Sequence, residues 1–198
     1  MKGETTGKFD IVVYGATGFT GALVAEYLFQ SHRDISWAIA GRSQTKLDAI
    51  KHQLGAPELA TLVADSDSVE DMTRLAAQSR VIISTVGPYA RYGTNLLEAC
   101  AAEGTHYCDL TGEPQWMAAV FERVSSAAEE SGARLIHCCG FDSIPSDLGV
   151  FVAQKTMMEN HGLYASKVSG RMGQSKGAVS GGTVASMRLA VEPAVNDP

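Results

Sequence analysis

The sequence has 198 residues, of which 45% are hydrophobic and 19% are charged. This length suits one well-buried domain of roughly 150 residues, with a remainder that is short for a second core. The net charge of -6 leaves no basic surface for a nucleic-acid backbone, and no apolar run approaches the roughly 20 residues of a transmembrane helix. The first ten residues also lack the apolar stretch of a signal peptide. We therefore expect a cytoplasmic protein that does not bind nucleic acid.

Short apolar runs alternate with amphipathic segments over most of the chain. The runs are bounded by turn residues and predict strands at 9–14, 35–40, 59–64, 80–84, 105–109 and 133–138. Apolar residues at three- and four-residue spacing predict helices at 19–30, 43–53, 67–78, 92–103 and 114–131. This alternation is typical of an α/β Rossmann fold, a doubly wound parallel sheet with the strand order 3-2-1-4-5-6. Ligands of such folds bind at the carboxyl ends of the strands, where the strand order reverses.

The pattern changes after residue 146. Residues 146–160 predict a helix, 167–173 a strand and 173–183 a glycine-rich loop, after which the chain stops without a closing element. We expect a fragment of a longer polypeptide. In this interpretation 1–146 form the Rossmann domain, and 147–198 form a linker and the beginning of an incomplete α+β domain for substrate binding or dimerisation.

The motif GATGFTG follows the first predicted strand directly and opens a helix. Its glycines permit a tight turn at Gly15, a close backbone approach to a pyrophosphate at Gly18, and packing of the helix on the sheet at Gly21. Backbone amides and the positive helix end would then bind the phosphates. The sequence predicts a dinucleotide site that includes Gly15, Ala16, Thr17, Gly18, Phe19, Thr20 and Gly21.

The end of the second strand indicates which dinucleotide binds. An acidic residue there would hydrogen-bond the ribose 2′-hydroxyl of NAD, but this sequence has AGRSQTK. Arg42 can pair with a 2′-phosphate and stack on adenine. NADP(H) is therefore favoured over NAD(H), with Gly41, Arg42, Ser43 and Lys46 as binding residues. The alternative is that Arg42 is a solvated loop charge.

Two further strand ends complete the predicted cofactor site. Asp65 either faces the adenine edge or caps the next helix, although Asp67 is the better cap candidate. The fourth strand ends in STVGPYARYG, beside the expected nicotinamide. Tyr89 is either a substrate contact at the cleft mouth or a surface aromatic. The predicted cofactor contacts here are Ser84, Thr85, Val86, Gly87 and Pro88.

Polar residues also follow the fifth and sixth strands, in CDLTGE and CCGFDSIPSD. Strand ends converge on one crevice, so these acids are candidate acid–base or substrate-orienting groups, with capping and turn formation as the alternative. They are Asp109, Glu113, Asp142 and Asp147, of which Asp109 and Asp142 join Tyr89 as catalytic candidates.

The histidines and cysteines carry no predicted chemistry. We interpret His106 and His137 as core or flanking residues, and His32, His52 and His161 as surface residues near helix ends. The four cysteines form no CxxC pair and no zinc-ligand spacing, so we expect reduced structural thiols and no metal.

Five motifs together resemble the NADP-binding domain of the saccharopine dehydrogenase family, including its trans-acting enoyl reductases. They are YGATGFTG, AGRSQTKL, STVGPYARYG, HYCDLTGE and CGFDSIPSDLG, and the resemblance runs from about Phe9 to Met187. It implies an NADP(H)-dependent oxidoreductase with a small-molecule or acyl substrate, and a second domain that closes the substrate cleft and supports a homodimer. Residues 177–187 resemble the start of that domain, where Ser180 to Thr183 could present a helix N-terminus to an anionic substrate group.

Three functions are weighed on these residues. The leading one is hydride transfer from NADPH to a C=C, C=N or C=O bond. A short-chain dehydrogenase needs a helical Tyr-x-x-x-Lys pair, which the sequence lacks. A catalytically silent NADP-binding sensor or scaffold remains as the alternative from another class.

Overall fold

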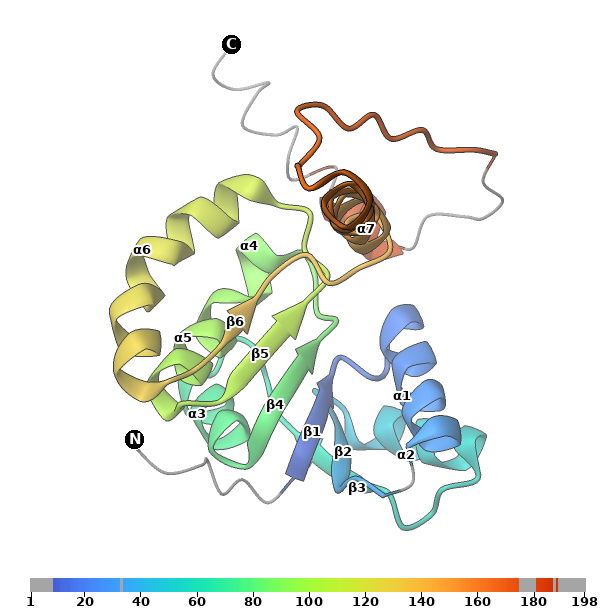
Figure 1. Ribbon diagram of the computed structural model, residues 1–198. Helices are drawn as coiled ribbons and strands as arrows, with labels where there is room; N and C mark the ends of the chain where they lie inside the picture. Colours follow the sequence, from blue (N-terminus) through green and yellow to red (C-terminus); the bar gives the residue numbers. More distant parts are fainter. Residues whose placement is uncertain (1–8, 33, 175–180, 187, 189–198) are drawn as a thin grey trace.

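The protein folds around one parallel sheet of six strands, seen in a computed structural model that describes residues 9–32, 34–174, 181–186 and 188 (Figure 1). The strands are β1 (Phe9–Tyr14), β2 (Trp37–Gly41), β3 (Ala60–Val63), β4 (Ser79–Ser84), β5 (His106–Asp109) and β6 (Leu135–Ile136). Their order is β3-β2-β1-β4-β5-β6, and all pairs are parallel. The predicted doubly wound Rossmann sheet and its strand order are confirmed.

Helices cover both faces of the sheet. On one side lie α1 (Phe19–Ser31) and α2 (Gln44–Leu54); on the other lie α3 (Val69–Ala77), α4 (Tyr89–Tyr92), α5 (Thr94–Glu103) and α6 (Pro114–Ser131). Because both faces are covered, the central strands are apolar throughout, as Val12, Val13 and Ile82 show by being completely buried. The strand ends therefore remain as the surface on which a ligand can bind.

Two elements differ from the sequence prediction because of tertiary contacts. The predicted helix 92–103 is observed as α5 from Thr94 to Glu103, with the separate short helix α4 before it and Gly93 between them, where a Cβ would lie 2.9 Å from Cζ2 of Trp116. The predicted strand 133–138 is reduced to Leu135–Ile136, because Cys138 adopts a positive φ of 61° and its amide turns to bond the Asp109 side chain.

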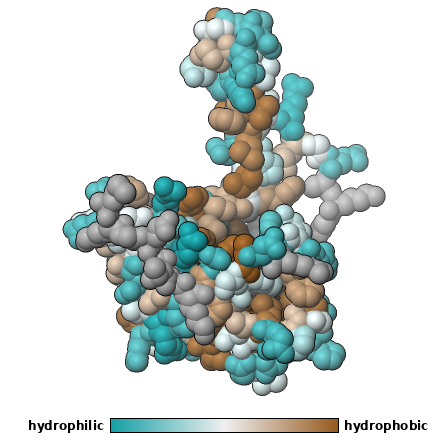
Figure 2. Space-filling model, turned by 60° about the horizontal axis from the view of Figure 1, so that its bottom comes forward, coloured by the Kyte–Doolittle hydropathy of each residue, from teal (hydrophilic) through white to brown (hydrophobic). Residues whose placement is uncertain are grey.

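The segment after β6 is only partly as predicted. Helix α7 (Ile144–His161) is longer than expected, and none of its residues is buried. The strand expected at 167–173 is wrong, because these residues form no regular secondary structure. Figure 2 shows α7 as a column that stands out from the body of the molecule. Residues 175–180 of the predicted glycine-rich loop lie outside the described part of the chain.

Candidate functional site

The site begins with the glycine turn between β1 and α1. Gly15 has a φ of +88°, and a Cβ there would lie 2.7 Å from Oγ1 of Thr85 and Cγ2 of Val86. A Cβ on Gly21 would overlap the carbonyl oxygen of Gly15. Only glycine at both positions lets this turn fit between the ends of β1 and β4. The turn therefore lies where the strand order reverses, as the motif predicted.

The amino end of α1 has properties that suit a phosphate. Its N-cap residue Gly18 has no side-chain cap, and no acidic residue lies in its first turn. The first-turn amides and the positive end of the helix dipole therefore have no anionic side chain as a partner within this element. The turn leaves room because Gly18 has no side chain, and Phe19 points outward, 74% exposed. These features fit a pyrophosphate held by backbone amides.

Arg42 lies at the carboxyl end of β2 and is exposed. Its guanidinium carbon is 5.9 Å from the centre of the Tyr92 ring, and the Arg91 guanidinium lies over the same ring at 5.1 Å. The second arginine was missed in the sequence because it comes from α4, 49 residues further along the chain. Two guanidinium groups beside Tyr92 make this end of the site positively charged, which suits a 2′-phosphate.

The predicted binding residues Ser43 and Asp65 also form hydrogen bonds within their own turns. The Ser43 hydroxyl caps α2 by accepting a hydrogen bond from the Lys46 amide at 3.5 Å. Asp65 follows β3 and accepts a hydrogen bond from the Asp67 amide at 3.1 Å. The cap of α3 is Ser68, whose hydroxyl accepts from the Asp71 amide at 3.2 Å, so the preference for Asp67 as the cap was wrong.

The end of β4 lies against the glycine turn. The Thr85 amide and hydroxyl both donate to the carbonyl of Tyr14, at 2.9 and 3.1 Å. Ser84, one residue earlier, is buried, and its hydroxyl has no hydrogen-bond partner among the described residues. These contacts fix the backbone of residues 84–86 beside the glycine turn, at the position where Rossmann folds generally bind the nicotinamide half of a dinucleotide.

Tyr89 is neither a surface aromatic nor an open substrate contact. It is only 4% exposed, and its hydroxyl donates to the carbonyl of Ser84 at 3.1 Å. The same hydroxyl accepts from the Leu110 amide at 3.4 Å, so it ties the ends of β4 and β5 together. Burial raises the pKa of this phenol far above its usual value, so it stays protonated at physiological pH.

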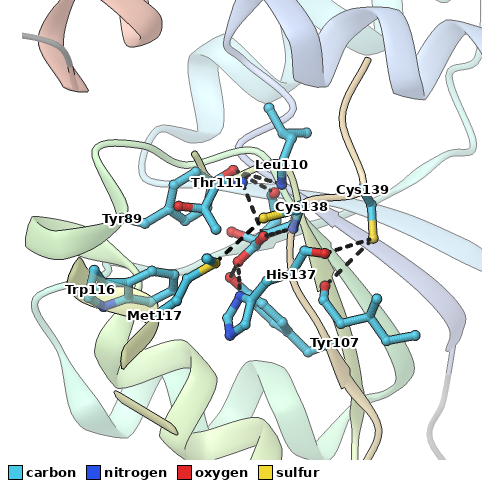
Figure 3. Close-up of polar contacts among 12 residues, drawn as sticks. Tyr89, Tyr107, Leu110, Thr111, Trp116, Met117, His137, Cys138 and Cys139 are labelled. Carbon is cyan, nitrogen blue, oxygen red and sulfur yellow. Dashed lines mark hydrogen bonds and ion pairs between the residues drawn. The ribbon is translucent and has the colours of Figure 1, made fainter. Parts of the chain in front are cut away.

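Asp109 ends β5 and is only 1% exposed. Figure 3 labels the neighbours Tyr107, Thr111, His137 and Cys138 that form a polar cluster with it. The Oδ1 atom of Asp109 accepts from the amides of Thr111 and Cys138, at 3.1 and 3.2 Å. Its Oδ2 accepts from the Tyr107 hydroxyl at 3.0 Å and lies 2.7 Å from Nδ1 of His137. The carboxylate therefore has two partners on each oxygen and joins β5 to the loop after β6.

His137 does more than the core role that the sequence suggested. Its ring packs edge-on against Tyr107 and Trp116, with centroids 6.0 and 5.2 Å away, while Nδ1 meets Asp109. The signal for this pair was present, because Asp109 ends β5 and His137 directly follows the neighbouring strand β6. Only the side-chain directions, which the sequence does not give, show that the two residues form a pair.

Glu113 forms the other polar junction of the site. Its Oε1 accepts from the Tyr89 amide at 2.9 Å and from the Ser186 hydroxyl at 2.8 Å, and its Oε2 accepts from the Ala90 amide at 2.8 Å. Ser186 was not singled out in the sequence. The structure brings it, from the described segment 181–186, to the turn that follows β4.

The remaining acidic candidates lie toward the exposed rim. Asp142 is exposed, and its Oδ2 would be 3.6 Å from a Cβ on Gly112, so it borders the loop after β5. Asp147 is exposed in the first turn of α7. The predicted helix start at 180–183 is described only from residue 181.

The thiols are all free and are held in their protonated form. Burial raises the pKa of Cys108 to about 12 and raises those of Cys100, Cys138 and Cys139 above their usual value. Cys100 is buried and Cys139 is exposed. Within the described residues no group of three or more His, Cys, Asp or Glu could hold a metal, and no helix there has the length and apolarity to cross a bilayer.

The fold, the glycine turn and the uncapped helix end together define a Rossmann dinucleotide-binding domain. Residues 11–136 match the family model of the saccharopine dehydrogenase NADP-binding domain. The chain belongs to this family, and its cofactor is NADP(H), as Arg42 predicted.

Curated relatives include a putative trans-acting enoyl reductase of Mycobacterium tuberculosis, 43% identical over 196 residues that cover 98% of this chain and 47% of the relative. A trans-acting enoyl reductase of Mycobacterium leprae is 40% identical over 194 residues, 96% of this chain and 46% of the relative. The chain thus spans about half the length of the curated relatives it matches.

Solved structures with the same fold include saccharopine dehydrogenase (L-Glu forming) of Saccharomyces cerevisiae in its apo form. The TM-score is 0.54 at 19% identity, over 77% of this chain and 31% of that one. Triphenylmethane reductase of Citrobacter sp., solved with NADP(H), gives a TM-score of 0.51 at 17% identity, over 75% of this chain and 55% of that one. Both likenesses concern the fold.

Proposed function

We propose that this chain is the cofactor-binding part of an NADP(H)-dependent oxidoreductase that reduces a C=C, C=N or C=O bond. The observation that carries the proposal is the uncapped α1 end beside the glycine turn, with Arg42 at the next strand end. The bound cofactor supplies a hydride, and the protein supplies orientation and charge. The names of the two mycobacterial relatives favour the C=C bond of an enoyl group in an acyl substrate.

Each predicted residue has a proposed place along the cofactor. Gly15 to Gly21 hold the pyrophosphate; Arg42, Ser43 and Lys46, with Arg91 added from the structure, hold the 2′-phosphate; and Asp65 borders the adenine. Residues 84–88 lie along the nicotinamide. The substrate enters beside the exposed Asp142, while the buried Tyr89 keeps the ends of β4 and β5 together. Asp109 acts on the substrate only through the groups that it holds, because both of its oxygens are occupied.

The organisation of the whole protein is part of the proposal. Residues 1–146 are the dinucleotide-binding domain, and 147–198 lead into a domain for the substrate. We also propose a homodimer through that domain, as the family resemblance implies, and a cytoplasmic location. A molar-mass measurement in solution on the full-length protein checks the dimer.

Calorimetric titration with NADPH and NADH tests the cofactor assignment. We expect tighter binding of NADPH, and we expect Arg42→Ala to weaken NADPH by about tenfold or more while NADH changes little, because only NADPH carries the phosphate that the guanidinium pairs with. An equal loss for both dinucleotides would remove the assigned role of Arg42.

An acceptor assay then separates an enzyme from a sensor. NADPH absorbance is followed with an enoyl thioester, an imine and a ketone as acceptors. Oxidation with one acceptor class identifies the reaction. Tight NADPH binding without oxidation by any acceptor, also in the full-length protein, would favour the catalytically silent sensor.

A further inference from the structure

Ser186 lies beside the turn that follows β4, although almost a hundred residues separate them in the chain. Its Oγ would be 3.9 Å from a Cβ placed on Gly87. Gly87 is part of the stretch along which the nicotinamide half of a dinucleotide is expected in this fold. The described segment 181–186 therefore lies beside the turn that follows β4.

Glu113 is the residue that holds Ser186 in this place. Its carboxylate is fixed first by the turn itself, since Tyr89 and Ala90 donate their amides to its two oxygens. The Ser186 hydroxyl then donates to Oε1 at 2.8 Å. Because a carboxylate only accepts, the direction of this hydrogen bond is set, and the lone pairs of the Ser186 oxygen remain for a donor from outside.

We propose that Ser186, held by the positioning residue Glu113, forms the outer wall of the nicotinamide end of the cofactor site and accepts a hydrogen bond from the nicotinamide carboxamide. The inference deepens the proposed function and rests on it. Segment 181–186 and the turn at residues 87–90 then enclose the ring together. In this arrangement the Glu113 carboxylate attaches segment 181–186 to the cofactor site.

The test separates the two halves of the cofactor. The 198-residue protein is titrated with NADPH and with adenosine 2′,5′-bisphosphate, which carries the adenine end without the nicotinamide. We expect Ser186→Ala to weaken the affinity for NADPH about tenfold, which is the effect of losing one hydrogen bond. The affinity for adenosine 2′,5′-bisphosphate should stay unchanged. Ser186→Thr keeps the hydroxyl and should keep most of the affinity. Ser125→Ala, which removes a hydroxyl that bonds within α6 to Phe121, is the matched control.

Glu113 is tested through a second readout. Hydrogen exchange of the peptide covering 181–186 should slow on NADPH binding in the unaltered protein, and this protection should be lost in both Glu113→Gln and Ser186→Ala. The double variant should lose no more affinity for NADPH than the stronger single variant, since both substitutions break the same Glu113–Ser186 hydrogen bond.

The outcomes separate this inference from the function on which it rests. If neither NADPH nor adenosine 2′,5′-bisphosphate binds, the cofactor site itself is wrong. If both ligands bind and Ser186→Ala changes neither the affinity for NADPH nor the hydrogen-exchange protection of 181–186, the cofactor site is supported and the proposed role of Ser186 is refuted. An equal loss for both ligands would also refute it, because the effect would then not lie at the nicotinamide end.

Discussion

At the scale of single residues, the strongest constraint on the site is the contact between two glycines. Gly21 packs on the Gly15 carbonyl so closely that there is no room for a side chain. This contact holds the start of α1 against the β1 end, and it sets where the first-turn amides point. The glycines of the motif are therefore required for a close backbone contact, and phosphate binding by the first-turn amides depends on that contact.

Gly21→Ala tests this requirement. The added methyl would force α1 away from the Gly15 carbonyl, so we expect a loss of about 1–3 kcal/mol in the free energy of unfolding and a loss of NADPH binding. Urea denaturation and calorimetry measure the two effects. Gly149→Ala on α7 is the control, because nothing lies within 4 Å of its Cβ position, and it should stabilise slightly. Equal behaviour of the two variants would contradict the packing role.

Tyr14 gives a residue-scale prediction about pH. It is 1% exposed, and burial raises its pKa to about 12. Because the folded-state pKa lies above the ordinary value near 10, the unfolded chain loses its proton first, and stability is complete below about pH 10. It then falls as the pH rises toward 12, by about 2–3 kcal/mol for this group.

Tyr14→Phe removes that titrating group. The variant should lose less stability than the unaltered protein between pH 10 and 12, measured by urea denaturation at each pH and by tyrosinate absorbance. Its hydroxyl donates a long hydrogen bond, 3.4 Å to the Ala64 carbonyl, so the cost at neutral pH should be small. Identical alkaline curves for both proteins would contradict the role of Tyr14.

At the scale of elements, the end of β5 is held to the loop after β6 by Asp109. Strand β6 is an edge strand of two residues, so backbone pairing alone ties it weakly to the sheet. The Asp109 carboxylate adds the Cys138 amide and His137 to that connection, and the Cys139 amide bonds the Asp109 carbonyl at 2.7 Å. Side-chain hydrogen bonds therefore supplement the few backbone hydrogen bonds of β6 and hold it to the sheet.

Asp109→Asn should show this. The amide would place a donor toward Tyr107 and His137, and the buried cluster would lose its charge, which we expect to cost about 2–4 kcal/mol in the free energy of unfolding. Urea denaturation measures the cost, with Asp67→Asn at an exposed position as the control. A difference below about 0.5 kcal/mol between them would show that the cluster does not stabilise the fold.

The sequence predicted elements well where local pattern decides the structure and poorly where distant side chains do. The central strands and the glycine turn follow from apolar runs and from motif spacing. The lack of space for a side chain at Gly93 depends on Trp116, the shortening of β6 depends on Asp109, and the Glu113–Ser186 contact spans 73 residues. The periodicity of apolar residues predicts none of these distant contacts. The acids looked equivalent in the sequence because burial and hydrogen-bond partners, which distinguish Asp109 from Asp142, come only from the fold.

At the scale of the whole molecule, the Rossmann body and the segment after it differ in packing. The buried core lies within residues 9–124, whereas α7 has no buried residue and carries exposed apolar side chains such as Leu148, Phe151 and Val152. A helix that buries nothing contributes little to the stability of the body on which it stands. The body should therefore fold without it.

Truncation after residue 146 tests this separation together with the cofactor site. The shortened chain should keep the midpoint of urea unfolding to within about 0.5 M and should bind adenosine 2′,5′-bisphosphate as the 198-residue chain does, since the glycine turn, Arg42 and the sheet remain. Its affinity for NADPH should fall about as far as in Ser186→Ala, because the outer wall of the nicotinamide end is removed. Unfolding of the truncated chain would show instead that α7 and the segment after it are part of one cooperative unit.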